Sequence, residues 1–455
     1  MIKPLLQAAI DTLVTRKHPG HMLVGDEAIA WLAGAGLGHG KIDTATGDAT
    51  GFGPEGMAAV GALAKAIRGP SAAYRRGASY PTFAAAVADQ VIATSRANSP
   101  PAVDDATVQR FEADLAAWWN TIAGQRRHFI PCAMLPDVAD DVVVGPVTFV
   151  HASRVVGHPL GLAQDHALTE LAWENIGRAL AERSAAWIAV VDVDGCHPNR
   201  STEIADLAVD VAITAVQLLV PVVYSRLMAR ITARTAPPWR GNLTVSDGEV
   251  SPGIQNNLPA LGLTGAAFSE MTSHGRTILD AAGRRLATFV AGQGPLPSID
   301  QAWCDAAYWF HEGLAEPLDT IAAAKLETAV EVLLRSTSSK GSGKRMRQAI
   351  EAVTGLMPKD PIAPGSAVNV DEFAKSLVGA RSQVLHGTFS TLTAELAPER
   401  SSLTGFAHLL LMTFAIQIEA FAVSTSAADD VETLLRWIGA RRAASTNPPP
   451  ATTTP

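Results

Sequence analysis

The stretch NVDEFAKSLVGARSQVLHG, from Asn369 to Gly387, carries the pattern on which our interpretation of this chain depends. Asn369 followed three residues later by Glu372 is typical of a capping box, in which each residue hydrogen-bonds the other's backbone at a helix start. Apolar residues then recur at helical spacing, and Gly387 suits the position just past a helix end. We therefore predict a helix over residues 369–386 that ends at His386.

A cation interrupts the apolar stripe of this predicted helix. Arg381 stands four residues after Leu377 and three before Val384, at the stripe's next position. Residues five apart on a regular helix lie about 140° apart, so Arg381 and His386 do not share one face. They could still flank one groove where two copies of the helix meet. A helix C-terminus favours the protonated form of a histidine, which suits a proton donor.

Helical patterns continue on both sides of this stretch. The segment AGQGPLP, residues 291–297, has the composition of a linker. After it we predict helices over 298–313, 317–335, 344–355, 369–386 and 403–425, with a short sixth at 427–441. Glu331 stands beside the apolar stripe of the second helix and is the residue best placed to orient Arg381.

The region before the linker mixes both kinds of secondary structure. A helix is predicted over 104–125, strands over 141–156 and 187–191, and a loop with short strands over 235–275. The predicted fold class is therefore mainly α, with an N-terminal α+β region at 1–292 and a C-terminal helical domain at 298–442. A further split near residue 135 is left open. Residues 443–455 have the low complexity of a disordered tail.

The segment Arg381-Ser-Gln-Val-Leu-His386 resembles the Arg-x4–6-His motif of the HEPN superfamily (higher eukaryotes and prokaryotes nucleotide-binding). Residues 306–314 and 325–334 are similar to the first helices of its abortive-infection-type, Apea-like branch. Residues 380–387 look like the signature helix end of that branch. The resemblance covers about 300–440 and implies a HEPN-type helical bundle.

That resemblance implies a metal-independent endoribonuclease in which an RNA 2′-OH attacks the adjacent phosphodiester. His386 would act as general acid or base, and Arg381 would stabilise the charge on the phosphate oxygens. Ser382 follows the Arg, where many active members carry Asn, Asp or His. Glu331 would orient Arg381. The family usually forms homodimers in which both motifs face one cleft.

A second group of residues suggests contact with RNA. The segment 335–347 is read as a loop and contains five cations and no acid, although the whole chain has a net charge of -8. Cations of this kind bind the phosphate backbone. The candidate RNA-binding residues are Lys340, Lys344, Arg345 and Arg347, and the alternative is a solvated flexible loop.

The predicted function is an RNA-cleaving toxin, or effector, of prokaryotic anti-phage defence by abortive infection. The N-terminal region would sense a trigger, and an antitoxin or a phage-derived trigger is a possible partner. The alternative is a catalytically inactive HEPN module that binds RNA or dimerises, with the N-terminal region carrying the function. A third, weaker option is a Mg²⁺-dependent phosphatase built on Asp192 and Asp194, which follow an apolar run as Asp-x-Asp.

No cofactor or metal is predicted. His151, His158, His166 and His197 gather near Cys196 but lack the short spacings of a zinc site. The chain has 3 Cys, which fits a reducing compartment. Polar residues interrupt the apolar run 406–423, which we interpret as a buried helix instead of a membrane span. The expected location is the cytoplasm, without membrane contact.

Overall fold

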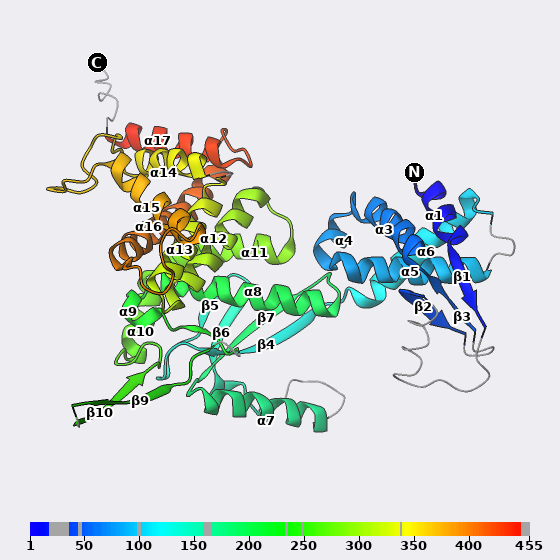
Figure 1. Ribbon diagram of the computed structural model, residues 1–455, viewed down its shortest axis with the longest axis horizontal. Coiled ribbons are helices and arrows are strands. Elements are labelled where there is room, and N and C mark those ends of the chain that lie inside the picture. The colour runs from blue at the N-terminus through cyan, green and yellow to red at the C-terminus, as the bar shows by residue number, and fades with distance from the viewer. Residues whose placement is uncertain are drawn as a thin grey trace, which may run out of the picture. The chain divides into compact units, whose positions relative to one another are not determined.

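The structure is a computed structural model, shown in Figure 1. It describes residues 1–17, 36–43, 48–97, 102–157, 166–232, 235–247, 249–336 and 339–446. The chain forms two compact units. Unit 1 contains Met1–Arg126 and Val193–Glu203, and unit 2 contains Arg127–Asp192 and Ile204–Pro455.

Unit 1 packs helices against a small antiparallel sheet with the strand order β1-β3-β2. Its elements are α1 (Ile2–Asp11), β1 (Leu13–Arg16), β2 (His39–Ile42), β3 (Ala49–Phe52), α3 (Pro54–Arg68), α4 (Ala72–Gly77), α5 (Tyr80–Ala97) and α6 (Asp105–Ile122). The predicted helix over 104–125 is confirmed as α6, and the Asp104 side chain caps it by accepting the Thr107 N–H at 2.7 Å. Phe52, Phe83 and Phe111 fill the core of the unit.

Unit 2 contains a five-stranded sheet with the order β5-β6-β7-β4-β8. Its strands are β4 (Arg126–Ala133), β5 (Val142–Val144), β6 (Val147–His151), β7 (Trp187–Val193) and β8 (Ala229–Arg230). The predicted strands within 141–156 and 187–191 are therefore confirmed. The short η1 (Ala152–Arg154) and α7 (His166–Glu182) connect β6 to β7, and α8 (Pro198–Gln217) follows β7. Helix α8 is buried from Ala208 onward and contacts the C-terminal helices through Thr214, which donates to Ala307 O at 2.9 Å.

A short helix, a hairpin and the C-terminal helices complete unit 2. They are α9 (Val222–Ser225), β9 (Trp239–Ser246), β10 (Glu249–Asn256), α10 (Gly265–His274), α11 (Arg276–Ala291), α12 (Pro297–Ala315), α13 (Asp319–Leu333), α14 (Ser339–Thr354), α15 (Val370–Leu385), α16 (Ala397–Ala422) and α17 (Val431–Thr446). Helices α11, α12, α13, α15 and α17 all pack against α16. Figure 1 shows β9 and β10 extending away from these helices. The described residues form a mainly helical fold with an α+β part, as predicted.

The structure divides the chain elsewhere than at the predicted linker 291–297. The two units separate at Arg126 and Arg127, close to the alternative split near residue 135, and the central sheet belongs with the C-terminal helices. Across the predicted linker, Arg285 on α11 is ion-paired with Asp300 on α12, and their side chains are 5% and 0% exposed. A buried ion pair holds α11 against α12, so this short connection does not separate two domains.

Two predicted boundaries in the C-terminal region are also corrected. The segment 335–347 is not a loop throughout, because α14 begins at Ser339. The tail predicted from residue 443 is helical as far as Thr446, the end of α17. Residues 447–455 and His158 lie outside the described residues.

Helix α16 is the one helix in the described parts of the chain that is long and apolar enough to cross a membrane by length and composition. Leu410, Leu411 and Phe414 of this helix are at most 1% exposed, and the helix packs against α11, α12 and α13. A core helix passes the same test of length and composition. The predicted helix over 403–425 is therefore confirmed as α16, one side of which is buried, while the cytoplasmic location stays a prediction.

Candidate functional site

Helix α15 forms as its capping signals predict. The Asn369 side chain accepts the Glu372 N–H at 2.9 Å, and the Glu372 carboxylate accepts the Asn369 N–H at 3.1 Å. The helix ends at the cap residue His386, and Gly387 follows with a φ of 69°. This left-handed conformation favours glycine and turns the chain out of the helix directly after the histidine.

The structure brings Arg381 of α15 and Glu331 of α13 together. The Arg381 Nη1 donates to Glu331 Oε2 in an ion pair, and the two side chains are 32% and 12% exposed. Within the described residues, the other guanidinium N–H groups of Arg381 have no hydrogen-bond partner. The pair therefore fixes one edge of the guanidinium and leaves donors free on a partly exposed group.

A second carboxylate lies beside this pair and was not predicted. Glu327, one turn before Glu331 on α13, is 1% exposed, and its Oε2 accepts the Arg381 backbone N–H at 3.2 Å. Burial, followed by the nearby Glu331 charge, raises the pKa of Glu327 to about 8. A signal for it was present in the sequence, because Glu327 and Glu331 are four residues apart on one helix.

Helix α14 contacts the Glu331 carboxylate through the oxygen that Arg381 does not use. The Ser342 hydroxyl donates to Glu331 Oε1, and Ser342 is 1% exposed. Glu331 is therefore held from two helices, by Arg381 through one oxygen and by Ser342 through the other. Sequence reasoning missed Ser342, because the segment was interpreted as a basic loop.

His386 and Ser382 differ in their surroundings. The His386 side chain is exposed and has no hydrogen-bond partner among the described residues, while its backbone N–H donates to Ser382 O at 3.0 Å. The Ser382 side chain is partly buried. His386 lies five residues, or about 1.4 helical turns, beyond Arg381, so a single chain does not stack the two side chains.

The predicted RNA-binding residues lie on α14, and two of the four are ion-paired within the protein. Arg345 is ion-paired with Glu432 and Arg347 with Asp371, each at 2.9 Å. Lys344 is exposed and has no partner in the part of the chain that the structure describes. The Lys340 side chain lies outside what the structure describes. The flexible-loop prediction is thus wrong from Ser339 onward, because ion pairs and the Ser342 contact hold this segment as a helix.

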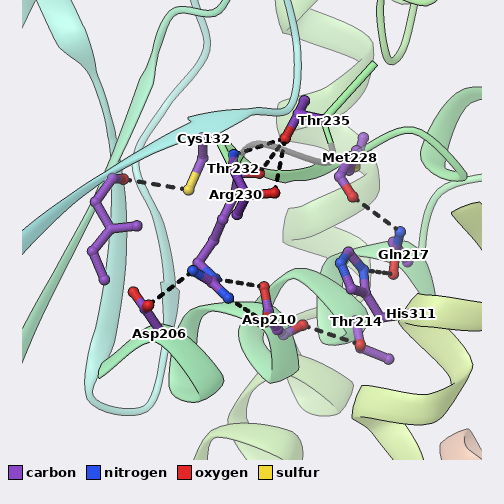
Figure 2. A network of polar contacts seen from close by, with 11 residues as sticks. Cys132, Asp206, Asp210, Thr214, Gln217, Met228, Arg230, Thr232, Thr235 and His311 are labelled. Carbon is purple, nitrogen blue, oxygen red and sulfur yellow. Dashed lines mark hydrogen bonds and ion pairs between the residues drawn. The ribbon is translucent and has the colours of Figure 1, made fainter. Parts of the chain in front are cut away.

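A second polar network lies between the sheet and the helices of unit 2 (Figure 2). Arg230 of β8 donates to both carboxylate oxygens of Asp210 at 2.7 and 2.9 Å, and it approaches Asp206 at 3.1 Å. Asp210 is 5% exposed. Burial raises the pKa of the neighbouring Cys132 thiol well above its usual range, which disfavours the reactive thiolate.

The buried His311 belongs to the same network. The Gln217 Nε2 donates to Ser225 O at 2.9 Å, so the Gln217 Oε1, 3.1 Å from His311 Nδ1, accepts a hydrogen bond from the N–H of that ring nitrogen. Burial lowers the pKa of His311, which favours the neutral ring. His311, Asp210, Arg230 and Lys325 line a cavity of about 690 Å³. Of the charged groups that line it, Arg230 is paired with Asp210, and Lys325 with Glu312 and Glu316, while Arg183 has no ion pair among the described residues.

The structure gives little support to the phosphatase option at Asp192 or to a metal site near Cys196. The Asp192 carboxylate accepts two hydrogen bonds from Arg127, each at 2.8 Å, so it is not a free nucleophile. Cys196 is buried, and burial raises the pKa of its thiol. Across the described residues, no group of three or more His, Cys, Asp and Glu could hold a metal ion.

The comparisons with known proteins identify no relative. No family model, curated protein or solved structure matches this chain.

Proposed function

We propose that this protein is a HEPN-type, metal-independent endoribonuclease that acts as a toxin in prokaryotic anti-phage defence by abortive infection. One observation carries the proposal. Near the end of α15, Arg381 is held by the carboxylate of Glu331 and keeps free donors, while the exposed His386 ends the same helix. These are the cation and the proton-transfer group that phosphodiester cleavage by a 2′-OH requires.

The chemistry follows from what each group can do. An RNA 2′-OH attacks the adjacent phosphorus and loses its proton, while the leaving 5′-oxygen gains one. A histidine can perform either transfer near neutral pH. The free N–H groups of Arg381 would bind the non-bridging phosphate oxygens, where negative charge accumulates in the transition state. Cleavage would leave a 2′,3′-cyclic phosphate and a 5′-hydroxyl.

Two copies of α15 would complete such a site. Arg381 and His386 point in directions about 140° apart on one helix. A homodimer with the two helix ends facing one cleft would supply an acid, a base and two guanidinium groups. RNA would approach past Lys344, since Arg345 and Arg347 each use a donor on an acidic partner within the protein.

Purified protein and the variants Arg381→Ala and His386→Ala test this function. The expected result is that wild-type protein cuts RNA in EDTA and arrests cell growth on expression, and that each variant loses both effects. RNA binding without cleavage, unchanged in His386→Ala, would instead support the inactive RNA-binding module. Cleavage that EDTA abolishes would contradict the proposed chemistry.

A further inference from the structure

Unit 2 contains a cavity of about 690 Å³ that the proposed cleavage of RNA does not use. Residues of β4, β8, α8, α12 and α13 line it, and three of them, Asp210, Arg230 and His311, are drawn in Figure 2. Its volume lies within the range of about 300–1,000 Å³ that is common for small-molecule sites. Part of its wall is apolar and includes Leu227 and Pro259. The cavity therefore has the size and the mixed lining of a ligand site.

Arg183, which follows α7, gives this cavity an uncompensated positive charge. Its side chain is partly buried, and within the described residues its guanidinium has no ion pair and no hydrogen-bond partner. A guanidinium presents parallel N–H donors that match the two oxygens of a carboxylate. Arg183 therefore suits an anionic group of a ligand.

A second group on the cavity wall has the opposite charge. The Lys325 Nζ lies 3.2 Å from Glu312 Oε2 and 3.0 Å from Glu316 Oε2, so two carboxylates share one ammonium group. The three side chains are only 16% to 27% exposed. The Glu312 Oε1 accepts no hydrogen bond within the described part of the chain. This cluster retains one net negative charge and an acceptor, which suits a second ammonium group.

The buried His311 adds a neutral acceptor to the wall. Its Nδ1–H donates to Gln217 Oε1, so its Nε2 carries the lone pair. His311 is 5% exposed, and its Nε2 has no hydrogen-bond partner among the described residues. Buried polar atoms are normally hydrogen-bonded, so this nitrogen indicates a ligand that brings an N–H donor into the cavity.

We propose that this cavity binds a zwitterion with a primary amine and a carboxylate, either an apolar or aromatic amino acid or a short peptide of such residues. Arg183 binds the carboxylate, and the carboxylates of Glu312 and Glu316 bind the ammonium group. His311 Nε2 accepts a hydrogen bond from an N–H of the ligand. The apolar part of the wall, which includes Leu227, contacts the ligand's side chains.

The charges around the cavity favour a ligand without net charge over a phosphate. Arg230 is already shared by Asp210 and Asp206, at 2.7 and 3.1 Å, so it adds no free positive charge. A phosphate monoester carries about 1.5 to 2 negative charges at neutral pH. Among the described residues on the wall, it would find Arg183 as its one unpaired cation and acids around the rest. A zwitterion places one group of each sign against its complement.

Calorimetric titration of the full chain tests this site without reference to RNA cleavage. The probes are leucine, phenylalanine and the dipeptides and tripeptides of each, and the tightest binder distinguishes an amino acid from a peptide. N-acetylation or C-terminal amidation of that binder should raise its dissociation constant at least about tenfold, because each removes one charge-assisted contact. The absence of binding by every probe, equal binding of the modified forms, or tighter binding of adenosine monophosphate would overturn the proposal.

Two variants assign the contacts to their residues. Arg183→Ala should raise the dissociation constant of the free ligand at least about tenfold and leave that of the amidated ligand unchanged. Glu312→Gln should weaken the free ligand and leave the acetylated ligand unchanged. Arg178→Ala, which removes an exposed arginine of α7, is the matched control and should bind as the wild type does. Circular dichroism should show that all three stay folded. Equal weakening of the free and amidated ligands in Arg183→Ala would overturn the assignment of the carboxylate.

Discussion

The guanidinium of Arg381 on α15 is ion-paired with Glu331 on α13, although the two residues are 50 positions apart in the sequence. Glu331 is itself held by Ser342 from α14, so three helices fix the orientation of one cation. An exposed arginine loses much side-chain entropy when it binds a phosphate, and pre-positioning by a carboxylate reduces this cost. The contact therefore suits a residue that must meet developing negative charge.

Glu331→Gln should lower RNA cleavage about tenfold to a hundredfold, because a misplaced guanidinium weakens transition-state stabilisation. The fold should change little, since a partly exposed ion pair contributes about 0–1 kcal/mol to stability. Initial cleavage rates and urea denaturation measure the two effects. Glu395→Gln, at an exposed carboxylate before α16, is the matched control. Wild-type rates in Glu331→Gln would show that the pair has no role in cleavage.

His386→Ala should reduce cleavage by at least about a hundredfold, the usual contribution of a general acid or base. Its free energy of unfolding should stay within about 0.5 kcal/mol of wild type, because the side chain is exposed and unpaired among the described residues. His274→Ala removes another exposed histidine at a helix end, that of α10, and should affect neither property. A destabilised His386→Ala protein would mean that the residue is structural.

Glu327 should make stability depend on pH. Its pKa is raised from the ordinary 4.5 to about 8 in the folded protein, so the folded state binds more protons than the unfolded state between these values. The stabilisation is present below about pH 4.5 and is lost as pH rises through about 8. Glu327→Gln is neutral at every pH and should be more stable than wild type at pH 9. Denaturation curves at pH 5, 7 and 9 measure this difference, and parallel pH profiles for the two proteins would refute it.

Arg230→Ala should destabilise unit 2 by about 3–5 kcal/mol, because it leaves the buried Asp210 carboxylate without its partner. Arg178→Ala removes an exposed pair with Glu174 on α7 and should cost less than about 0.5 kcal/mol. Urea denaturation of both variants gives the comparison. Equal losses would mean that the network around Arg230 adds little to the fold.

The C-terminal helices could be predicted from the sequence because their signals are local. Asn369 and Glu372 mark the start of α15, and Gly387 marks its end. The place of Glu331 beside an apolar stripe predicts it as the partner of Arg381, and the structure places the two side chains together. The catalytic roles of these residues stay predictions.

The start of α14, the division into two units and the β9–β10 strands could not be predicted, because they depend on contacts between residues distant in sequence. The start of α14 is rich in Ser, Gly and Lys, which are weak helix signals, and it is held by Ser342 and by the Arg347–Asp371 pair. The division of the chain was missed because a buried pair between Arg285 and Asp300 is not visible in composition. The predicted loop over 235–275 contains two eight-residue strands whose alternation is clear only once their register is known.

Cleavage of one RNA oligonucleotide and its singly 2′-deoxy counterpart, both in EDTA, tests the central claim most directly. We predict that the wild-type protein cuts the RNA to a 2′,3′-cyclic phosphate and leaves the bond after the 2′-deoxy residue intact. Arg381→Ala and His386→Ala should leave both substrates intact. Cleavage at the 2′-deoxy position, or unchanged cleavage by both variants, would contradict the account.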